Sequence, residues 1–216
     1  TTMSRLCQIL AAVLLVAAVP SCRKSPPPAP VTIDRYREVE EFTFTNQENA
    51  PVSRADLLGK VWVANFIFTS CSAECLVLSQ RMGALQTRYA ANPGVAFVSF
   101  SVDPHTDQPP RLQQYARTWQ ADPGRWSFLT GPVEALDGIV KHSFLLPVAR
   151  GPEEQAELIR SNFVHSNKFA IVDRQGTARA YVHGLQNGSV EQTAGVIDRL
   201  LQEPAAPAAM AAPDRS

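Results

Sequence analysis

The sequence lacks several features that would assign it to common functional classes. Its 20 basic side chains are balanced by 20 acidic ones, so the formal net charge at pH 7 is zero. Nucleic-acid binding depends on an excess of positive charge, and we therefore expect no nucleic-acid partner. No apolar run reaches the roughly 18 residues of a membrane-spanning helix, which excludes a polytopic membrane protein. Only four cysteines and four histidines are present, so a site built on soft ligands must draw on few residues.

Proline is concentrated at the two ends of the chain. Eight of the 17 prolines lie outside residues 34–201, which leaves 17 − 8 = 9 for that central stretch. The stretch is long enough for one domain that buries roughly two-thirds of its unfolded surface, and too short for two. We predict a single domain over residues 34–201. Residues 202–216 are rich in alanine and proline and have few large apolar groups, so we predict a disordered tail.

Residues 1–21 have the pattern of a bacterial signal peptide, because Arg5 precedes the eleven apolar residues Ile9–Val19. The sequence Val19-Pro20-Ser21-Cys22 resembles the lipobox of bacterial lipoproteins, although Pro20 departs from that pattern. In such proteins the cysteine becomes the lipidated first residue of the mature chain. Residues 22–33 are proline-rich and predict a stiff tether. We expect an exported lipoprotein that is anchored through Cys22 to the bacterial cell membrane and faces the periplasm or the outer side; simple cleavage and an uncleaved anchor are the alternatives.

Residues 34–201 alternate between predicted strands and helices. Strands are expected at 41–45, 61–68, 95–102 and 126–130, with a turn at 57–60, and helices at 73–91, 111–120 and 133–142. A hairpin at 167–172 and 177–182 precedes a final helix that runs to Leu201 with Ser189 as its N-cap. Residues 145–158 show no period and indicate a loop or lid. This order predicts an α/β protein, a thioredoxin-like sandwich with a central mixed sheet flanked by helices.

Two cysteines are left for chemistry, because Cys7 lies in the signal peptide and Cys22 is the lipid site. Cys71 and Cys75 follow a strand that we expect to be buried on both faces, at the end where α/β sheets place their ligands. If Cys71 lies at the start of the helix and Cys75 in its first turn, free N–H groups and the helix dipole favour the thiolate. Their Cα atoms would lie about 6 Å apart, near enough for a disulfide or for one shared soft metal ion. A purely structural disulfide is possible, but such a short loop removes little chain entropy.

Three collinear segments of the chain resemble motifs of the Sco/SenC proteins. Phe66-Ile67-Phe68-Thr69-Ser70-Cys71, with Cys75, is similar to F-x-F-T-x-C-x-x-x-C. Ser101-Val102-Asp103-Pro104, with Asp107 and Pro109, is similar to S-V-D-P-x-x-D-x-P, and Trp126–Gly131 to W-x-F-L-T-G. The likeness extends from about Phe42 to Leu201. Many family members have proline after each cysteine, where this chain has Ser72 and Leu76, and this departure bears on the shape of the pocket and on partner choice.

The resemblance implies a copper site with a third ligand. In Sco proteins a distant histidine, followed by serine shortly before a strand, completes the site with the two thiolates. His165 matches that position, so the resemblance implies that Cys71, Cys75 and His165 bind copper, as Cu(I), Cu(II) or both. Two thiolates and an imidazole suit Cu(I), whereas zinc prefers four ligands. The other histidines are weaker candidates: His105, His142 and His183.

The resemblance implies a membrane-tethered copper chaperone that delivers copper to the CuA centre of cytochrome c oxidase subunit II. The alternative is a thiol-disulfide oxidoreductase that keeps the client cysteines reduced, with Cys71 attacking and Cys75 resolving. These roles imply a copper donor or a thioredoxin-like reductant as further partners. A peroxiredoxin-like peroxidase would need a threonine and an arginine beside the thiolate; Thr69 fits, but no partner arginine is identifiable from the sequence. A non-catalytic binding module is a further possibility.

Overall fold

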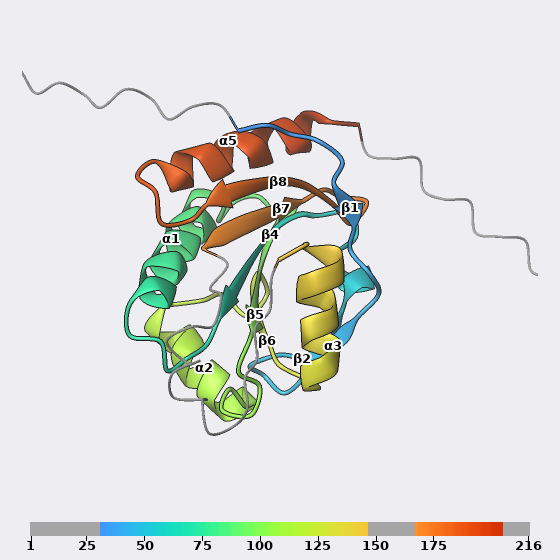
Figure 1. Ribbon diagram of the computed structural model, residues 1–216. Coiled ribbons are helices and arrows are strands. Elements are labelled where there is room, and N and C mark those ends of the chain that lie inside the picture. The colour runs from blue at the N-terminus through green and yellow to red at the C-terminus, as the bar shows by residue number, and fades with distance from the viewer. Residues whose placement is uncertain (1–30, 147–166, 205–216) are drawn as a thin grey trace, which may run out of the picture.

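A computed structural model describes residues 31–146 and 167–204 of the chain. Its centre is a six-stranded sheet in the order β1-β8-β7-β4-β5-β6 (Figure 1). β4, β5 and β6 are parallel, whereas β7 is antiparallel to both β4 and β8, and β1 is antiparallel to β8. The sheet is therefore mixed, as predicted. The strands are β1 (Arg37–Glu38), β4 (Val61–Ile67), β5 (Val95–Ser101), β6 (Trp126–Leu129), β7 (Lys168–Val172) and β8 (Thr177–His183).

Helices cover both faces of the sheet and complete the predicted thioredoxin-like sandwich (Figure 1). One face packs against α1 (Glu74–Arg88), α2 (Pro109–Thr118) and α5 (Ser189–Gln202). The other packs against α3 (Val133–Gly138) and the π-helical turn η2 (Ile139–Ser143). The same face also carries the two-stranded sheet of β2 (Thr43–Thr45) and β3 (Pro51–Ser53) and the 3₁₀ turn η1 (Arg54–Leu57).

β4 connects the two hydrophobic cores because all seven of its residues are buried. Successive side chains of a strand point to opposite faces of the sheet. Val63 and Ile67 accordingly pack in the core beneath α1, whereas Trp62 and Phe66 pack in the core beneath α3. The prediction that this strand is buried on both faces is confirmed. Its carboxyl end is thus held rigidly, and the segment that follows it carries Cys71.

The structure corrects three details of the sequence-based prediction. Thr43–Thr45 pairs with Pro51–Ser53 in a separate small sheet, and β3 was missed because three residues that include a proline give no strand pattern.

Ser189 is the first residue of α5, while Gly188, with φ of 80°, occupies the N-cap position. The Ser189 hydroxyl instead donates to the Gly184 carbonyl and accepts from Arg81. The helix predicted at 133–142 changes to π-helical geometry at Ile139. Most of the loop predicted at 145–158 lies outside the described residues.

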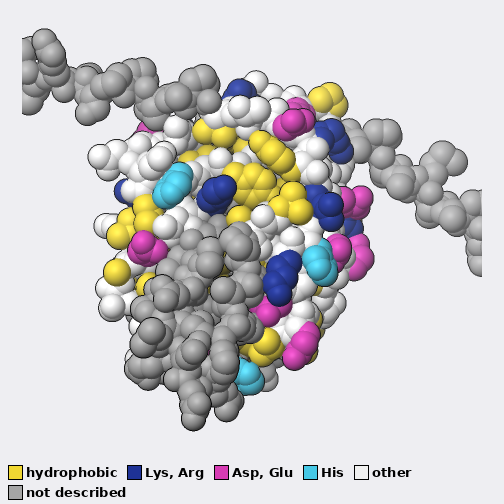
Figure 2. All heavy atoms as spheres, in the orientation of Figure 1, with side chains coloured by type: hydrophobic (Ala, Val, Ile, Leu, Met, Phe, Trp, Pro, Cys, Tyr) yellow, Lys and Arg dark blue, Asp and Glu magenta, His cyan; other side chains and the backbone are white. Residues whose placement is uncertain are grey.

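The surface in view carries charges of both signs. Within residues 31–146 and 167–204 no helix combines the length and the apolar character that crossing a bilayer requires. On the face shown in Figure 2, basic and acidic side chains are interspersed rather than gathered into one region of a single sign. This distribution agrees with the zero net charge of the chain.

Candidate metal centre and dithiol site

The two cysteines lie where β4 passes into α1. The Cys71 N–H donates to the carbonyl of Phe68 at 3.2 Å, which forms a turn directly after the strand. α1 begins only at Glu74, and its N-cap residue Ala73 has no side chain that could accept a hydrogen bond. The sulfur of Cys71 accepts instead from the N–H of Cys75, at 3.4 Å. Cys71 therefore precedes the helix rather than starting it, and its sulfur takes the part of a capping side chain for the first helical turn.

The two thiols differ in exposure. Cys71 is partly exposed, whereas Cys75 is 1% exposed, and both are free thiols. Burial raises the pKa of the Cys75 thiol well above its ordinary value, and the neighbouring sulfur of Cys71 adds to this shift. Cys75 consequently keeps its proton at neutral pH until a metal or a disulfide displaces it. A partner molecule reaches Cys71 first.

A buried carboxylate holds the turn in front of Cys71. Asp107 is fully buried and accepts the Thr69 hydroxyl at 2.5 Å, the Thr69 N–H at 3.2 Å and the Ser101 hydroxyl at 2.7 Å. Burial raises the pKa of the Asp107 carboxyl, and the hydrogen bonds from Thr69 and Ser101 oppose that shift. Arg111, in the first turn of α2, donates its Nε to the Thr69 hydroxyl oxygen at 2.5 Å. The sequence identified no arginine partner for Thr69, and the structure shows that Arg111 is one.

A second residue of α2 reaches the start of α1. The hydroxyl of Tyr115 lies 2.9 Å from that of Ser79 and 3.5 Å from the carbonyl oxygen of Cys75. Burial raises the pKa of Tyr115 to about 12, so the phenol stays protonated. Sequence reasoning missed Tyr115 and Arg111, although their spacing of four residues places both on one face of a helix.

The predicted third ligand, His165, lies outside the described residues, and so does the predicted lipid site, Cys22. The described chain resumes beside α1: the Gly184 N–H donates to the Asn167 carbonyl at 2.5 Å, and a Cβ on Gly184 would collide with Leu78 of α1. Within the described ranges no three His, Cys, Asp or Glu side chains gather into a metal-binding group. The other histidines are all exposed: His105, His142 and His183.

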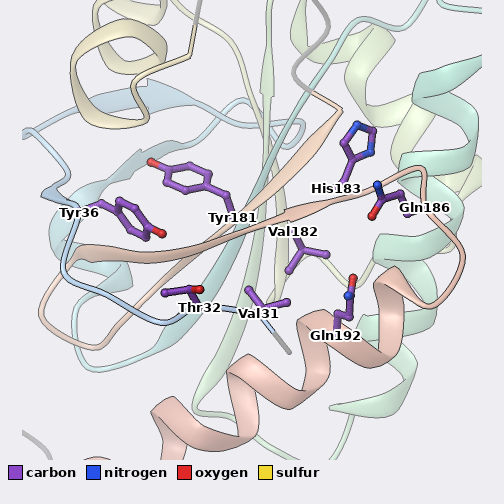
Figure 3. Close-up of a pocket in the computed structure, with 8 residues that line it drawn as sticks. All are labelled: Val31, Thr32, Tyr36, Tyr181, Val182, His183, Gln186 and Gln192. Carbon is purple, nitrogen blue, oxygen red and sulfur yellow. The ribbon is translucent and has the colours of Figure 1, made fainter. Parts of the chain in front are cut away.

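A groove elsewhere on the molecule plays no part in this site. It has a volume of about 350 Å³ and lies between the segment before β1, strand β8 and the start of α5 (Figure 3). Neither cysteine lines it. His183 and Tyr181 lie on its β8 side and Gln192 on its α5 side. The groove is therefore separate from the two cysteines at the junction of β4 and α1.

Comparison with known proteins identifies a family that shares this architecture. Residues 31–202 match the family model described as SCO1/SenC. A SCO1 protein homolog from Bacillus subtilis (strain 168) is 35% identical over 152 residues, which make up 69% of this chain and 76% of that protein. A SCO1/SenC family lipoprotein from Bacillus anthracis strain Ames has a crystal structure with a TM-score of 0.70 and 32% identity, covering 81% of this chain and 100% of that one.

Two further solved structures carry informative descriptions. BsSco, a member of the Sco family of cytochrome c oxidase assembly proteins in which a disulfide switch was identified, has a TM-score of 0.66 and 28% identity, covering 81% of this chain and 99% of that one. Bradyrhizobium japonicum ScoI, solved with copper bound, has a TM-score of 0.60 and 20% identity, covering 76% of this chain and 99% of that one. The last likeness shows the shared fold alone.

Proposed function

The chain belongs to the SCO1/SenC family, and on that premise we propose that it is a copper chaperone that binds copper through Cys71, Cys75 and His165. It delivers the copper to the CuA centre of cytochrome c oxidase subunit II. The observation that carries this proposal is the pairing of an accessible Cys71 with a buried Cys75 at the carboxyl end of β4. The oxidase-assembly role of BsSco gives further support.

The donor set fits copper as a cargo. Two thiolates and one imidazole are soft to intermediate ligands that suit Cu(I), and an added ligand would accommodate Cu(II). The N–H of Cys75 points at the Cys71 sulfur, which suits a sulfur that carries negative charge. His165 would approach from the segment that leads into β7, and β7 begins three residues later at Lys168. The ends of β7 and β8 pack beside α1 through Gly184 and Leu78.

The unequal exposure of the two sulfurs suggests the order of transfer. A client thiolate replaces the accessible Cys71 first, while Cys75 and His165 still hold the ion. Cys75 leaves next and recovers its proton, because burial raises the pKa of its thiol. Exchange of one ligand at a time avoids release of the free ion. A copper donor would load the site by the same steps in reverse.

We propose that the copper-binding domain, residues 34–201, is tethered to the bacterial cell membrane and faces the periplasm or the outer side. The signal peptide of residues 1–21 is removed, Cys22 carries the lipid, and residues 22–33 form the stiff tether. Residues 202–216 form the tail. The lipoprotein character of the Bacillus anthracis relative supports this arrangement. The mass of the N-terminal peptide from membrane-extracted protein tests it, since lipidation adds acyl groups to Cys22.

Substitution of the third ligand tests the copper site. His165→Ala should lower the affinity for Cu(I) by more than about 100-fold, which exceeds the 10- to 100-fold typical of losing an outer-shell partner. His142→Ala, at an exposed histidine 3.9 Å from Glu40, is the matched control and should leave the affinity unchanged. Chelator competition on reduced protein measures both. An unchanged affinity in His165→Ala would show that the ligand set is wrong.

The alternative function is thiol-disulfide exchange with the same client, and the disulfide switch of BsSco favours considering it. The Cys71 thiolate attacks the client disulfide and forms a mixed disulfide. Cys75 then loses its proton and attacks the Cys71 sulfur, which releases the client dithiol and leaves a Cys71–Cys75 disulfide. Two electrons have passed to the client, and a thioredoxin-like dithiol must restore the reduced form. His165→Ala separates the two roles, because it should spare this exchange while it abolishes tight copper binding.

A further inference from the structure

The turn that carries Cys71 has little local support of its own. It lies between the end of β4 and the start of α1, and the N-cap residue Ala73 contributes no side-chain hydrogen bond. The Cys71 N–H donates to the Phe68 carbonyl and closes the turn, and the Cys75 N–H reaches back to the Cys71 sulfur. Further hydrogen bonds reach the residues just before Cys71 from outside the turn, at Thr69.

Asp107 supplies that support from 36 positions further along the chain than Cys71, and its carboxylate is fully buried. It accepts both the hydroxyl and the N–H of Thr69, which lies two residues before Cys71. Its second oxygen accepts the hydroxyl of Ser101, the last residue of β5. Hydrogen bonds to a charged acceptor are roughly twice as strong as neutral ones. The carboxylate thus fastens the turn to the end of the neighbouring strand.

Arg111 completes the arrangement from α2. Its Nε donates to the Thr69 hydroxyl oxygen, while that hydroxyl donates its own proton to Asp107. The Thr69 hydroxyl therefore lies between a guanidinium and a carboxylate, and the positive charge compensates the buried negative one. One helical turn later, Tyr115 contacts Ser79 and the carbonyl of Cys75. The same helix holds the segments of both cysteines.

We infer that Asp107 and Arg111 are positioning residues, which act through Thr69 to hold Cys71 at the separation from Cys75 that binding one metal ion requires. This inference deepens the proposed copper function and rests on it for its metal readout. The arrangement also bears on oxidation, since a disulfide brings the two sulfurs to about 2.05 Å and the turn must shift to allow it. A firmly held turn should favour the dithiol, and a released turn the disulfide.

Thr69→Val tests the inference because valine keeps the shape of threonine and removes the hydroxyl. We expect an affinity for Cu(I) about 10- to 100-fold weaker than that of the wild type. In a glutathione redox buffer, oxidised glutathione converts the Cys71–Cys75 dithiol to a disulfide and is reduced to two glutathione thiols. The equilibrium constant for this oxidation should be about tenfold larger in Thr69→Val than in the wild type, which is a change of ~30 mV in reduction potential. Thr69→Ser keeps the hydroxyl and should restore both values. Arg111→Gln changes an exposed side chain. It should shift the Cu(I) affinity and the glutathione equilibrium in the same direction as Thr69→Val, but by a smaller amount.

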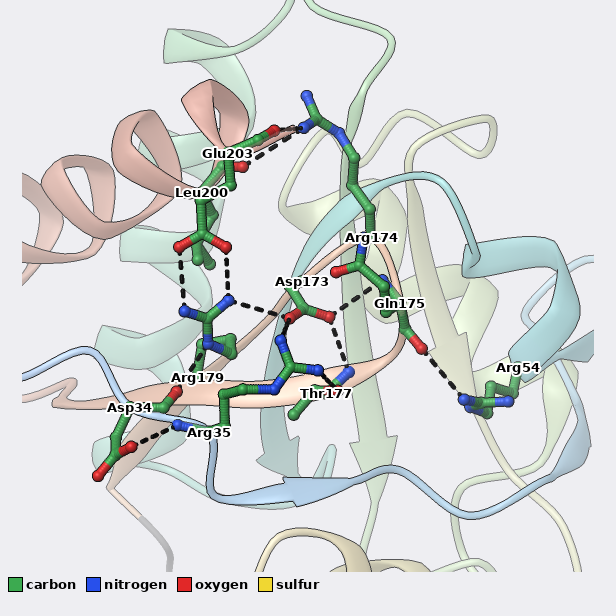
Figure 4. Close-up of polar contacts among 10 residues, drawn as sticks. All are labelled: Asp34, Arg35, Arg54, Asp173, Arg174, Gln175, Thr177, Arg179, Leu200 and Glu203. Carbon is green, nitrogen blue, oxygen red and sulfur yellow. Dashed lines mark hydrogen bonds and ion pairs between the residues drawn. The ribbon is translucent and has the colours of Figure 1, made fainter. Parts of the chain in front are cut away.

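Arg179→Met is the matched control for a mere loss of stability. Arg179 belongs to a polar cluster with the buried Asp173 and the partly exposed Glu203 (Figure 4). That cluster lies at the other end of β4, where the Gly59 N–H, just before the strand, donates to the Arg174 carbonyl. The variant should be destabilised with unchanged copper affinity and unchanged glutathione equilibrium.

The two readouts separate this inference from the copper function on which it rests. If the wild type bound no copper, a tenfold shift of the glutathione equilibrium in Thr69→Val, with rescue by Thr69→Ser, would still support the positioning role. Wild-type values of both quantities in Thr69→Val would overturn it. Equal shifts in Arg179→Met would overturn it too, because they would show that the site responds to stability alone.

Discussion

Arg179 provides the sharpest test of what holds the domain together away from the dithiol. Its guanidinium contacts the Asp34 carbonyl at 2.7 Å, Asp173 at 3.1 Å and both oxygens of Glu203 at 2.7 and 3.0 Å (Figure 4). These partners belong to the segment before β1, the turn between β7 and β8, and the end of α5. Arg179→Met keeps much of the apolar stem of the side chain and removes every one of these contacts.

The loss of stability follows from the burial of each partner. Glu203 is 43% exposed, so its ion pair is worth at most about 1 kcal/mol. The Asp173 side chain is only 3% exposed, and breaking a buried ion pair costs about 3–5 kcal/mol because one charge is left behind. Asp173 still accepts the N–H groups of Gln175 and Thr177 after the substitution, and Arg35 stays 3.8 Å from its carboxylate, which reduces that cost. We expect Arg179→Met to lower the free energy of unfolding by about 3 kcal/mol.

Urea denaturation of reduced protein at pH 7 measures this change. The control is Arg88→Met, which removes an ion pair to Asp198 at 3.6 Å whose two side chains are each about half exposed; it should cost less than about 1 kcal/mol. A double-mutant cycle of Arg179→Met with Asp173→Asn should give a larger coupling energy than one with Glu203→Gln. A loss in Arg179→Met no greater than that in Arg88→Met would refute the reasoning.

Two further predictions concern the surroundings of the dithiol. Gly184→Ala should destabilise the protein by about 1–3 kcal/mol in urea, because the new Cβ lies 3.0 Å from the Asn167 carbonyl and collides with Leu78. Gly195→Ala is the control, because Gly195 lies in a helix with open space around it, and this substitution should stabilise the protein by about 0.5–1 kcal/mol. Equal effects of Gly184→Ala and Gly195→Ala would contradict the close packing of Gly184 against Leu78. The affinity for Cu(I) should rise with pH between about 6 and 8, since the raised pKa of Cys75 keeps a proton there that copper must displace. Chelator competition across that range measures the slope, and an unchanged slope in Cys75→Ser would show that Cys75 is not a ligand.

The elements that the sequence predicted well are those whose signal is local. Five of the seven residues of β4 are β-branched or aromatic, and α1 carries its buried positions at helical spacing, as Leu78, Met82 and Leu85 show. The pairing of Cys71 with Cys75 needed only a spacing of four residues. The structure moves Cys71 out of the helix, because Ala73 and not Cys71 is the N-cap. His165 stays a prediction.

The supporting residues of the site could not be predicted in the same way. Thr69 and Asp107 are 38 residues apart, and Thr69 and Arg111 are 42 apart. Each contact depends on the sheet order that places the end of β4 beside the end of β5, a property of the whole fold. A polar side chain in a loop carries no periodic signal that would reveal its partner. Only the resemblance of residues 101–109 to a family motif drew attention to Asp107, and it gave the residue no role.

Many family members have a proline after each cysteine, and the lack of both prolines in this chain makes the supporting contacts of Thr69, Asp107 and Arg111 more important. A proline fixes φ near −65° and removes an N–H, so it would stiffen the turn on its own. This chain has Ser72 and Leu76 at those positions, and Leu76 is exposed. With neither proline present, the position of Cys71 depends on hydrogen bonds, among them those from Thr69 to the fully buried Asp107. Serine and leucine in place of the two prolines do not affect the two sulfurs or the hydrogen bond from the Cys75 N–H to the Cys71 sulfur. The chain thus keeps the chemistry of the dithiol while the rigidity of the turn comes from the neighbouring strand and α2.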